Sequence, residues 1–281
     1  MLGLSGRWAK VPIFLRAVTA GLLIALPAAN AWPLLLIHLS ARFAAVAEAI
    51  FLALYIWWAA GGGPPRTWQN IRANSFRRGP LSAPQWIWGI IAALCFAGTI
   101  HASIVLLFRL VAFPVAEFRR GYDFSFIPTV PLRWLAIVIS AASAGICEET
   151  GFRGYLQRPI ELSHGAPPAI LISSLFFTVL HLTKGWALAG MIPIVFGAGI
   201  LLGSLALSAG SLIPGMIGHT VMDVGLFAYW WTGIAGEFTL RPIGETGMDR
   251  AFVIACGAAS VTLTVTVLAI WRLRRLSYSV Y

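Results

Sequence analysis

A chain of 281 residues is long enough for one or two soluble domains, but its composition excludes a soluble protein. Hydrophobic residues make up 59% of the chain, only 11% are charged, and the mean hydropathy is +0.83. A soluble fold of this size cannot bury so much apolar surface, whereas a lipid bilayer covers it. The net charge of +10 lies in short segments between apolar runs, so it indicates membrane topology and lipid headgroups rather than nucleic acid.

Apolar runs of about 20 residues, the length that spans a bilayer, predict an all-α polytopic membrane protein with about eight transmembrane helices. These runs cover residues 11–36, 41–60, 84–111, 132–156, 166–182, 187–208, 212–231 and 250–271. The first run resembles a cleavable secretory signal as far as Ala31, but it continues long enough to span, so we expect an uncleaved first helix. Residues 113–130 mix aromatic and charged side chains, which predicts an interfacial loop; the alternative is a gate for substrate.

The basic residues predict that both termini lie in the cytoplasm, because Lys and Arg are enriched in cytoplasmic loops. In this orientation the cytoplasmic side carries Arg7, Lys10, Arg16, Arg66, Arg72, Arg77, Arg78, Arg153, Arg158, Arg272, Arg274 and Arg275. The opposite side carries Arg42, Arg109, Arg119, Arg120, Arg133, Lys184, Arg241 and Arg250.

Three polar clusters interrupt the apolar helices, although an ionisable side chain at membrane depth costs roughly 3 kcal/mol or more. In the first cluster, Glu148 and Glu149 are adjacent and point about 100° apart on a helix, so they serve different roles. Glu149 and Arg153 are spaced i,i+4, which favours an ion pair and leaves Glu148 as a candidate general base. The alternative is a structural Glu149–Arg153 clamp with a solvated Glu148.

The other two clusters place histidines on apolar helices. Phe177 and His181 share one helical face, and so do His219 and Asp223. A single His on an apolar helix is more often a packed core residue. A second His with a carboxylate on its own face can instead bind a metal, orient a water or donate a hydrogen bond to an oxyanion.

Other polar residues are expected to have no part in this chemistry. Glu48, on the second helix, is expected to pair with Arg42, and His101 is expected to have no partner. The three cysteines lie in apolar stretches without metal-type spacing, so we interpret them as small buried hydrophobic residues: Cys95, Cys147 and Cys256.

Taken in order on successive helices, the motifs resemble those of the CAAX prenyl endopeptidase and bacteriocin-processing family, also called CPBP or Abi. The family motifs Glu-Glu-x-x-x-Arg, Phe-x-x-x-His and His-x-x-x-Asn/Asp stand here as Glu148-Glu149-x-x-x-Arg153, Phe177-x-x-x-His181 and His219-x-x-x-Asp223. The resemblance covers about residues 132–231. Asp223 stands where the eukaryotic prenyl-protein members typically have Asn, and bacterial members vary at this position.

The resemblance implies a helical core around a water-filled cavity that opens to the bilayer. By position, Glu148 and His181 would activate water, and His219 and Asp223 would stabilise the tetrahedral oxyanion. The supporting residues would be Glu149, Arg153 and Phe177. An ionised Asp223 would repel an oxyanion, so it is expected to be protonated, to bind a metal or to orient His219.

The metal requirement has two alternatives. Zinc would be held by His181, His219 and either Glu148 or Asp223. We expect glutamate and histidine chemistry without a metal, because the chain lacks the His-x-x-x-His pair that commonly anchors zinc on one helix.

We therefore predict a CPBP-type intramembrane endopeptidase of the bacterial inner membrane, acting on a membrane-embedded or lipidated peptide. Residues 1–131 form N-terminal helices and the interfacial loop, residues 132–231 form the catalytic core, and residues 232–281 form an outer loop, the last helix and a basic tail. The alternatives are a catalytically silent scaffold or bacteriocin-immunity protein, and a proton-coupled transporter. Transport is disfavoured because the polar residues lie in one half of the chain rather than in matched positions of two repeats.

Overall fold

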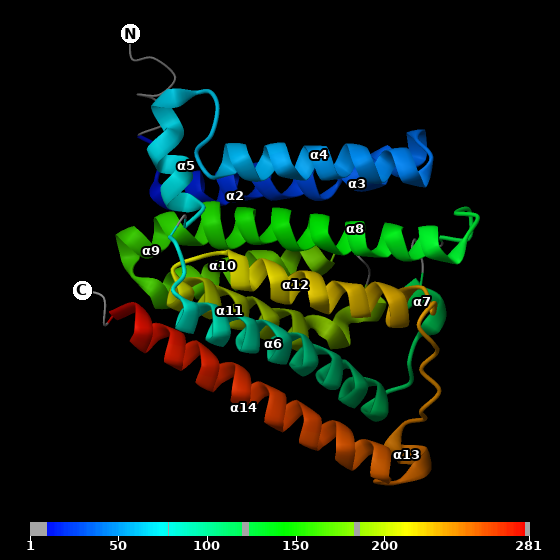
Figure 1. The fold of residues 1–281 in the computed structure, drawn as a ribbon. Helices are drawn as coiled ribbons and strands as arrows, with labels where there is room; N and C mark the ends of the chain where they lie inside the picture. Colours follow the sequence, from blue (N-terminus) through cyan, green and yellow to red (C-terminus); the bar gives the residue numbers. More distant parts are fainter. Residues whose placement is uncertain (1–9, 78, 120–123, 183–185, 279–281) are drawn as a thin grey trace.

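The computed structural model describes residues 10–77, 79–119, 124–182 and 186–278, and every regular element within these residues is helical (Figure 1). Six helical segments are long and apolar enough to cross a membrane: Ile13–His38, Ala41–Ala59, Ala83–Leu110, Val130–His164, Ala189–Ala209 and Arg250–Ser277. The prediction of an all-α membrane protein is confirmed. Arg7, Arg78, Arg120 and Lys184, used for the topology, lie outside the described residues.

Two of the expected eight spans differ from the other six. Residues 166–182 form α10 (Ala166–His181), whose 16 residues are too few for a full crossing. Residues 212–231 form α12 (Ile213–Gly225) followed by the π-helix η5 (Leu226–Trp231), which are not among the six apolar segments. The number of eight crossings therefore stays a prediction.

The remaining elements have the following bounds. The N-terminal part contains α2 (Ile13–Ala29), α3 (Ala31–His38), α4 (Ala41–Ala59), η1 (Arg66–Trp68), α5 (Gln69–Ser75), α6 (Ala83–Leu110) and α7 (Val115–Arg119). The rest contains α8 (Val130–Glu149), the π-helix η2 (Thr150–Gln157), α9 (Arg158–His164), η4 (Trp186–Met191), α11 (Ile192–Ala209), α13 (Ile243–Thr246) and α14 (Arg250–Tyr278).

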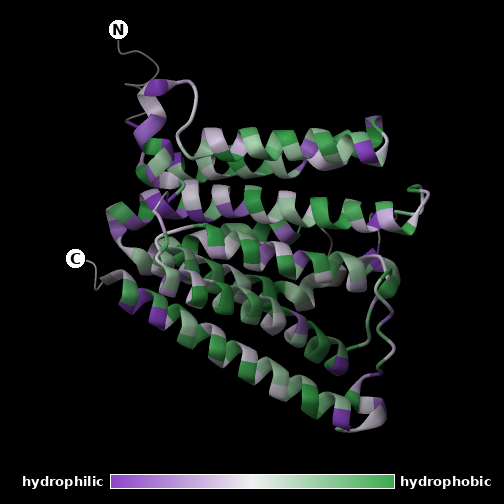
Figure 2. Ribbon diagram, viewed as in Figure 1, coloured by the Kyte–Doolittle hydropathy of each residue, from purple (hydrophilic) through white to green (hydrophobic). Residues whose placement is uncertain are grey.

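The long helices run roughly along one direction and form a layered bundle. In Figure 1, α2, α3 and α4 lie on one side of α8, while α10, α11, α12 and α6 lie on its other side and α14 covers the outer edge. The beginning of α2 and the end of α14 lie at the same end of the bundle as α5 and α9. Figure 2 shows hydrophilic residues gathered mainly at the two ends and hydrophobic residues along the helices, as expected for a bundle in lipid.

The segment expected to be an interfacial loop packs on the end of the bundle in its described part. Phe118 of α7 is buried, with its ring centroid 5.5 Å from that of Phe108 and 5.2 Å from that of Phe113. Residues 120–123 of this segment lie outside the described residues.

Small residues bring α8 and the η2 segment that continues it close to neighbouring helices. A Cβ added at Gly145 of α8 would lie only 2.9 Å from the backbone nitrogen of Thr220 on α12. A Cβ added at Gly21 of α2 would lie 2.7 Å from the Cβ of Leu156 in η2. Such approaches are typical of membrane helices, where small residues let backbones pack closely. They set α8 and α12 close enough for their polar side chains to meet.

Glu48 does not pair with Arg42 as the sequence suggested. Glu48 is fully buried, and its Oε1 accepts a hydrogen bond from the Ser143 hydroxyl of α8 at 2.6 Å. Arg42 is exposed. Six residues of α-helix turn by roughly 240°, so the two side chains leave α4 on different faces. Glu48 thus joins α4 to α8.

Candidate active site

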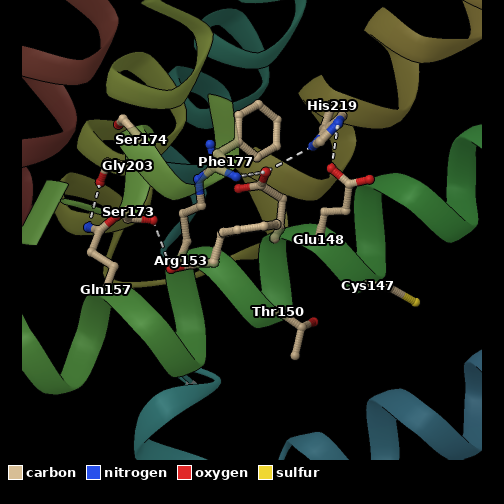
Figure 3. A network of polar contacts seen from close by, with 12 residues as sticks. Cys147, Glu148, Thr150, Arg153, Gln157, Ser173, Ser174, Phe177, Gly203 and His219 are labelled. Carbon is tan, nitrogen blue, oxygen red and sulfur yellow. Dashed lines mark hydrogen bonds and ion pairs between the residues drawn. The ribbon is translucent and has the colours of Figure 1, made fainter. Parts of the chain in front are cut away.

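The three polar clusters meet where side chains from the ends of α8 and α10 reach α12 (Figure 3). Glu148 and Glu149 end α8, His181 ends α10, and His219 and Asp223 lie on α12. In Figure 3, Glu148 points toward His219, whereas Cys147 and Thr150 leave the helix on the opposite side. Adjacent glutamates on one helix therefore face different surroundings, as their sequence positions predicted.

Glu149 is the most buried member of the group and binds two partners. Its Oε1 lies 2.9 Å from Arg153 Nη1 and 2.9 Å from His219 Nδ1, and the Glu149 and Arg153 side chains are fully buried. The predicted Glu149–Arg153 ion pair is confirmed. Because an ionised carboxylate only accepts hydrogen bonds, His219 donates through Nδ1–H to Glu149.

This bond fixes the direction of the other imidazole nitrogen. His219 Nε2 lies 3.6 Å from Asp223 Oδ2 and 3.9 Å from Glu148 Oε2. Three carboxyl groups thus surround one imidazole, with the Arg153 guanidinium beside Glu149. A hydrogen on Nε2 would be directed to the side of His219 where Glu148 and Asp223 lie.

Phe177 packs against the charged and imidazole groups of the site. The Arg153 guanidinium carbon lies 4.4 Å from the Phe177 ring centroid, a cation–π distance. The His181 ring lies 4.5 Å from the same ring, and the His219 ring meets it edge-on at 5.8 Å. The buried aromatic ring therefore fixes the spacing between Arg153 and the two histidines.

His181 is oriented by its own helix. Its Nδ1 lies 2.7 Å from the carbonyl oxygen of Phe177. A carbonyl only accepts, so Nδ1 carries the hydrogen, and Nε2 of the neutral ring is the acceptor nitrogen.

All four residues proposed from the sequence as catalytic line one cavity. Glu148, His181, His219 and Asp223 contribute to the wall of a chamber of about 90 Å³, whose remaining wall is mostly apolar. The sequence therefore identified side chains that converge in space. Among the described residues, no three His, Cys, Asp or Glu side chains are arranged to hold a metal ion.

Sequence reasoning missed several contacts that hold this arrangement. His101 was expected to have no partner, yet its Nε2 lies 3.1 Å from the Met222 carbonyl, and its Nδ1 accepts a hydrogen bond from Trp230 at 3.4 Å. Likewise, Gln157 of η2 donates to the Gly203 carbonyl of α11 at 3.0 Å (Figure 3). These contacts join residues that are far apart in the sequence, so no local spacing of residues predicts them.

One comparison with known proteins found a similar family. Residues 129–225 match the family model of the type II CAAX prenyl endopeptidase Rce1-like proteins. This segment is similar to that family. The Rce1-like segment extends from the start of α8 to the end of α12 and contains every residue of the three motifs. The match supports a membrane protease of the CAAX type in general. No curated protein and no solved structure matches the chain.

Arg153→Ala is expected to destabilise the protein by about 3–5 kcal/mol, because it leaves Glu149 as a buried charge without its guanidinium partner. Thermal unfolding in detergent and accumulation in membranes measure the effect. Arg241→Ala is the matched control, since Arg241 forms an exposed i,i+4 pair with Glu245 at 3.6 Å. Loss of that pair should cost at most about 1 kcal/mol. Equal unfolding of the two variants would contradict the assignment.

Proposed function

We propose that this protein is an intramembrane endopeptidase that hydrolyses peptide bonds of a membrane-embedded or lipidated peptide with a water activated by Glu148 and His181. The observation that carries the proposal is the convergence of Glu148, His181, His219 and Asp223 on one chamber among apolar helices. Ionisable groups at such positions are costly, so a group of them in one chamber favours a chemical role. The Rce1-like match over residues 129–225 supports the same reaction class.

Water activation is assigned to the two side chains that reach the chamber from α8 and α10. The Glu148 side chain is 21% exposed, whereas Glu149 is fully buried and engaged by two partners. Glu148 takes a proton from the attacking water, and the acceptor nitrogen of His181 holds the water through its second hydrogen. The water oxygen then forms a bond to the peptide carbonyl carbon.

Stabilisation of the oxyanion is assigned to His219. Because Glu149 fixes Nδ1–H, a hydrogen on Nε2 is directed to the region where the carbonyl oxygen becomes negatively charged. Asp223, 3.6 Å from Nε2, balances the positive charge of a doubly protonated ring. In this arrangement Asp223 acts on His219, whose positive charge offsets the repulsion between the Asp223 carboxylate and the oxyanion.

Collapse of the tetrahedral intermediate completes the reaction. The carbon–nitrogen bond breaks as Glu148–H returns its proton to the leaving nitrogen. The products are one new carboxyl group and one new amine, and the site returns to its starting protonation state. No step requires a metal.

The cellular setting is also part of the proposal. The bundle end that holds α5 and α9 carries Arg72, Arg77 and Arg158. We place this end in the cytoplasm, with both termini, in the inner membrane of a bacterium. The substrate would be a bacteriocin, a lipidated peptide or a C-terminal sorting segment, rather than a prenylated protein.

Glu148→Gln is expected to lower kcat by about 10²–10⁴-fold while leaving the unfolding temperature unchanged, because an amide cannot take a proton from water. His181→Ala should have a similar effect. The measurement is peptide release by purified protein reconstituted in vesicles, followed by mass spectrometry. Normal turnover by Glu148→Gln would refute the mechanism, and a folded wild type without Glu148-dependent cleavage would favour a silent scaffold.

Asp223→Asn is expected to keep kcat within about tenfold of wild type, whereas Asp223→Leu should lose about 10²–10³-fold. The amide oxygen still places a partial negative charge beside His219 Nε2, whereas the leucine side chain places none there. Steady-state kinetics of the two variants in the same vesicles test this. Full activity of Asp223→Leu would show that Asp223 has no role in catalysis.

Exhaustive chelation is expected to leave the activity of the purified protein unchanged, because every step is assigned to side chains. Metal content measured by mass spectrometry in the same samples provides the control. Loss of activity that zinc restores would overturn this expectation and would make Asp223 a ligand or a group that orients one.

A further inference from the structure

Two chambers meet at the proposed active site. The inner chamber of about 90 Å³ contains both imidazoles and Asp223, and a second chamber of about 390 Å³ lies outside it. Four residues line both chambers: Ala144, Glu148, His181 and Phe227. The side chains assigned to water activation therefore stand at the neck between the chambers.

The outer chamber has the size and polarity for the apolar part of a peptide. One wall comes from α2 and α3 and includes Leu26, Pro33 and Leu36. The opposite wall comes from α8, where Ser140, Ala144 and Glu148 recur every four residues and so share one face. Leu26 is 39% exposed, so the α2 wall reaches the lipid-facing surface of the bundle. A bulky apolar side chain fits this volume.

The inner chamber has room for much less. A buried water needs about 10–15 Å³ of cavity volume, so the attacking water takes part of the 90 Å³ of the inner chamber. The rest of the wall includes Ile194, Met222 and Leu226, which hold no polar group for a long side chain. The inner chamber has only about a quarter of the volume of the outer one, so the smaller of the two residues beside the scissile bond enters it next to the water.

Ala144 has the smallest side chain among the four neck residues. It is half-buried and lies one helical turn before Glu148 on the same face of α8. A larger side chain at this position would narrow the passage that leads to Glu148, and the loss of its methyl group would widen it.

We propose that Ala144 determines which residue is accepted beside the scissile bond. The preferred substrate has a bulky apolar residue such as Leu or Phe in the outer chamber and a small residue such as Gly, Ala or Ser entering the inner one. This inference rests on the proposed proteolytic function and adds a substrate class to it. Ala144 acts only through the size of its side chain, which sets the width of the passage, and takes no part in the chemistry.

The test uses the purified full-length chain in phosphatidylethanolamine and phosphatidylglycerol vesicles. The substrates are single-span peptides in which the central residue pair is varied among Gly, Ala, Ser, Val, Leu and Phe, with products identified by mass spectrometry. Wild type, Ala144→Gly and Ala144→Leu are compared with Ala142→Leu. Ala142 is the matched control because it is also half-buried on α8 and lines neither chamber.

Wild type and Ala142→Leu should prefer Gly, Ala or Ser over Leu and Phe on one side of the cleaved bond, by about tenfold or more in kcat/KM. Ala144→Gly should reduce this preference by admitting Val and Leu. Ala144→Leu should lower kcat/KM for every pair by about tenfold or more. If Ala144→Leu fails to accumulate, Ala144→Gly decides the result, since it removes only one methyl group.

Two outcomes separate the inference from the function on which it rests. Glu148-dependent cleavage with the same residue preference in wild type and Ala144→Gly would overturn the role of Ala144 alone. If wild type yields no product that is lost in Glu148→Gln, the proposed function is wrong, and this inference fails with it.

Discussion

A fully buried carboxylate, Glu149, is the group on which the arrangement of the site depends. Its cost of burial is offset only while Arg153 stays beside it, and the same oxygen receives the Nδ1–H of His219. One residue therefore links the end of α8 to α12 and sets the direction of His219 Nε2. Phe177 adds a third element, because its ring covers Arg153 and contacts both histidines. The geometry of the chamber follows from this small charged core.

The close approach of the helix backbones makes this charged core possible. Gly145 lets α8 and α12 come close, and both helices continue as π-helical segments, η2 directly after Glu149 and η5 after Gly225. π-helical turns are rare and often occur at functional sites, because they shift the register of side chains and alter backbone hydrogen bonding. In η2, the Phe152 carbonyl accepts a hydrogen bond from Ser173 of α10 at 3.0 Å. The irregular segment η2 thus ties the end of α8 to α10.

The sequence predicted what depends on local spacing and missed what depends on tertiary contacts. Residues i and i+4 share a helical face, so the Glu149–Arg153 pair and the common face of His219 and Asp223 could be read directly. Composition indicated the all-helical membrane fold. The second partner of Glu149 and the bonds of His101 join different helices, and no periodicity encodes which helices become neighbours. The Glu48 prediction was wrong for the same reason: nearness in sequence suggested Arg42, whereas the partner lies on α8.

The hydrogen bond between Glu48 and Ser143 also limits how the N-terminal helices and the Rce1-like segment can be exchanged between proteins. Ser143 lies within the Rce1-like segment, and Glu48 lies outside it on α4. The bond fixes the rotation of α8 from the side opposite Glu148, so helices without a family motif help to aim the motif residues. A chimera that joins residues 129–225 to the N-terminal helices of another protein would have to supply a matching partner for Ser143. The boundary of an interchangeable unit therefore runs through side-chain contacts between helices, and a cut in a loop between helices does not reproduce it.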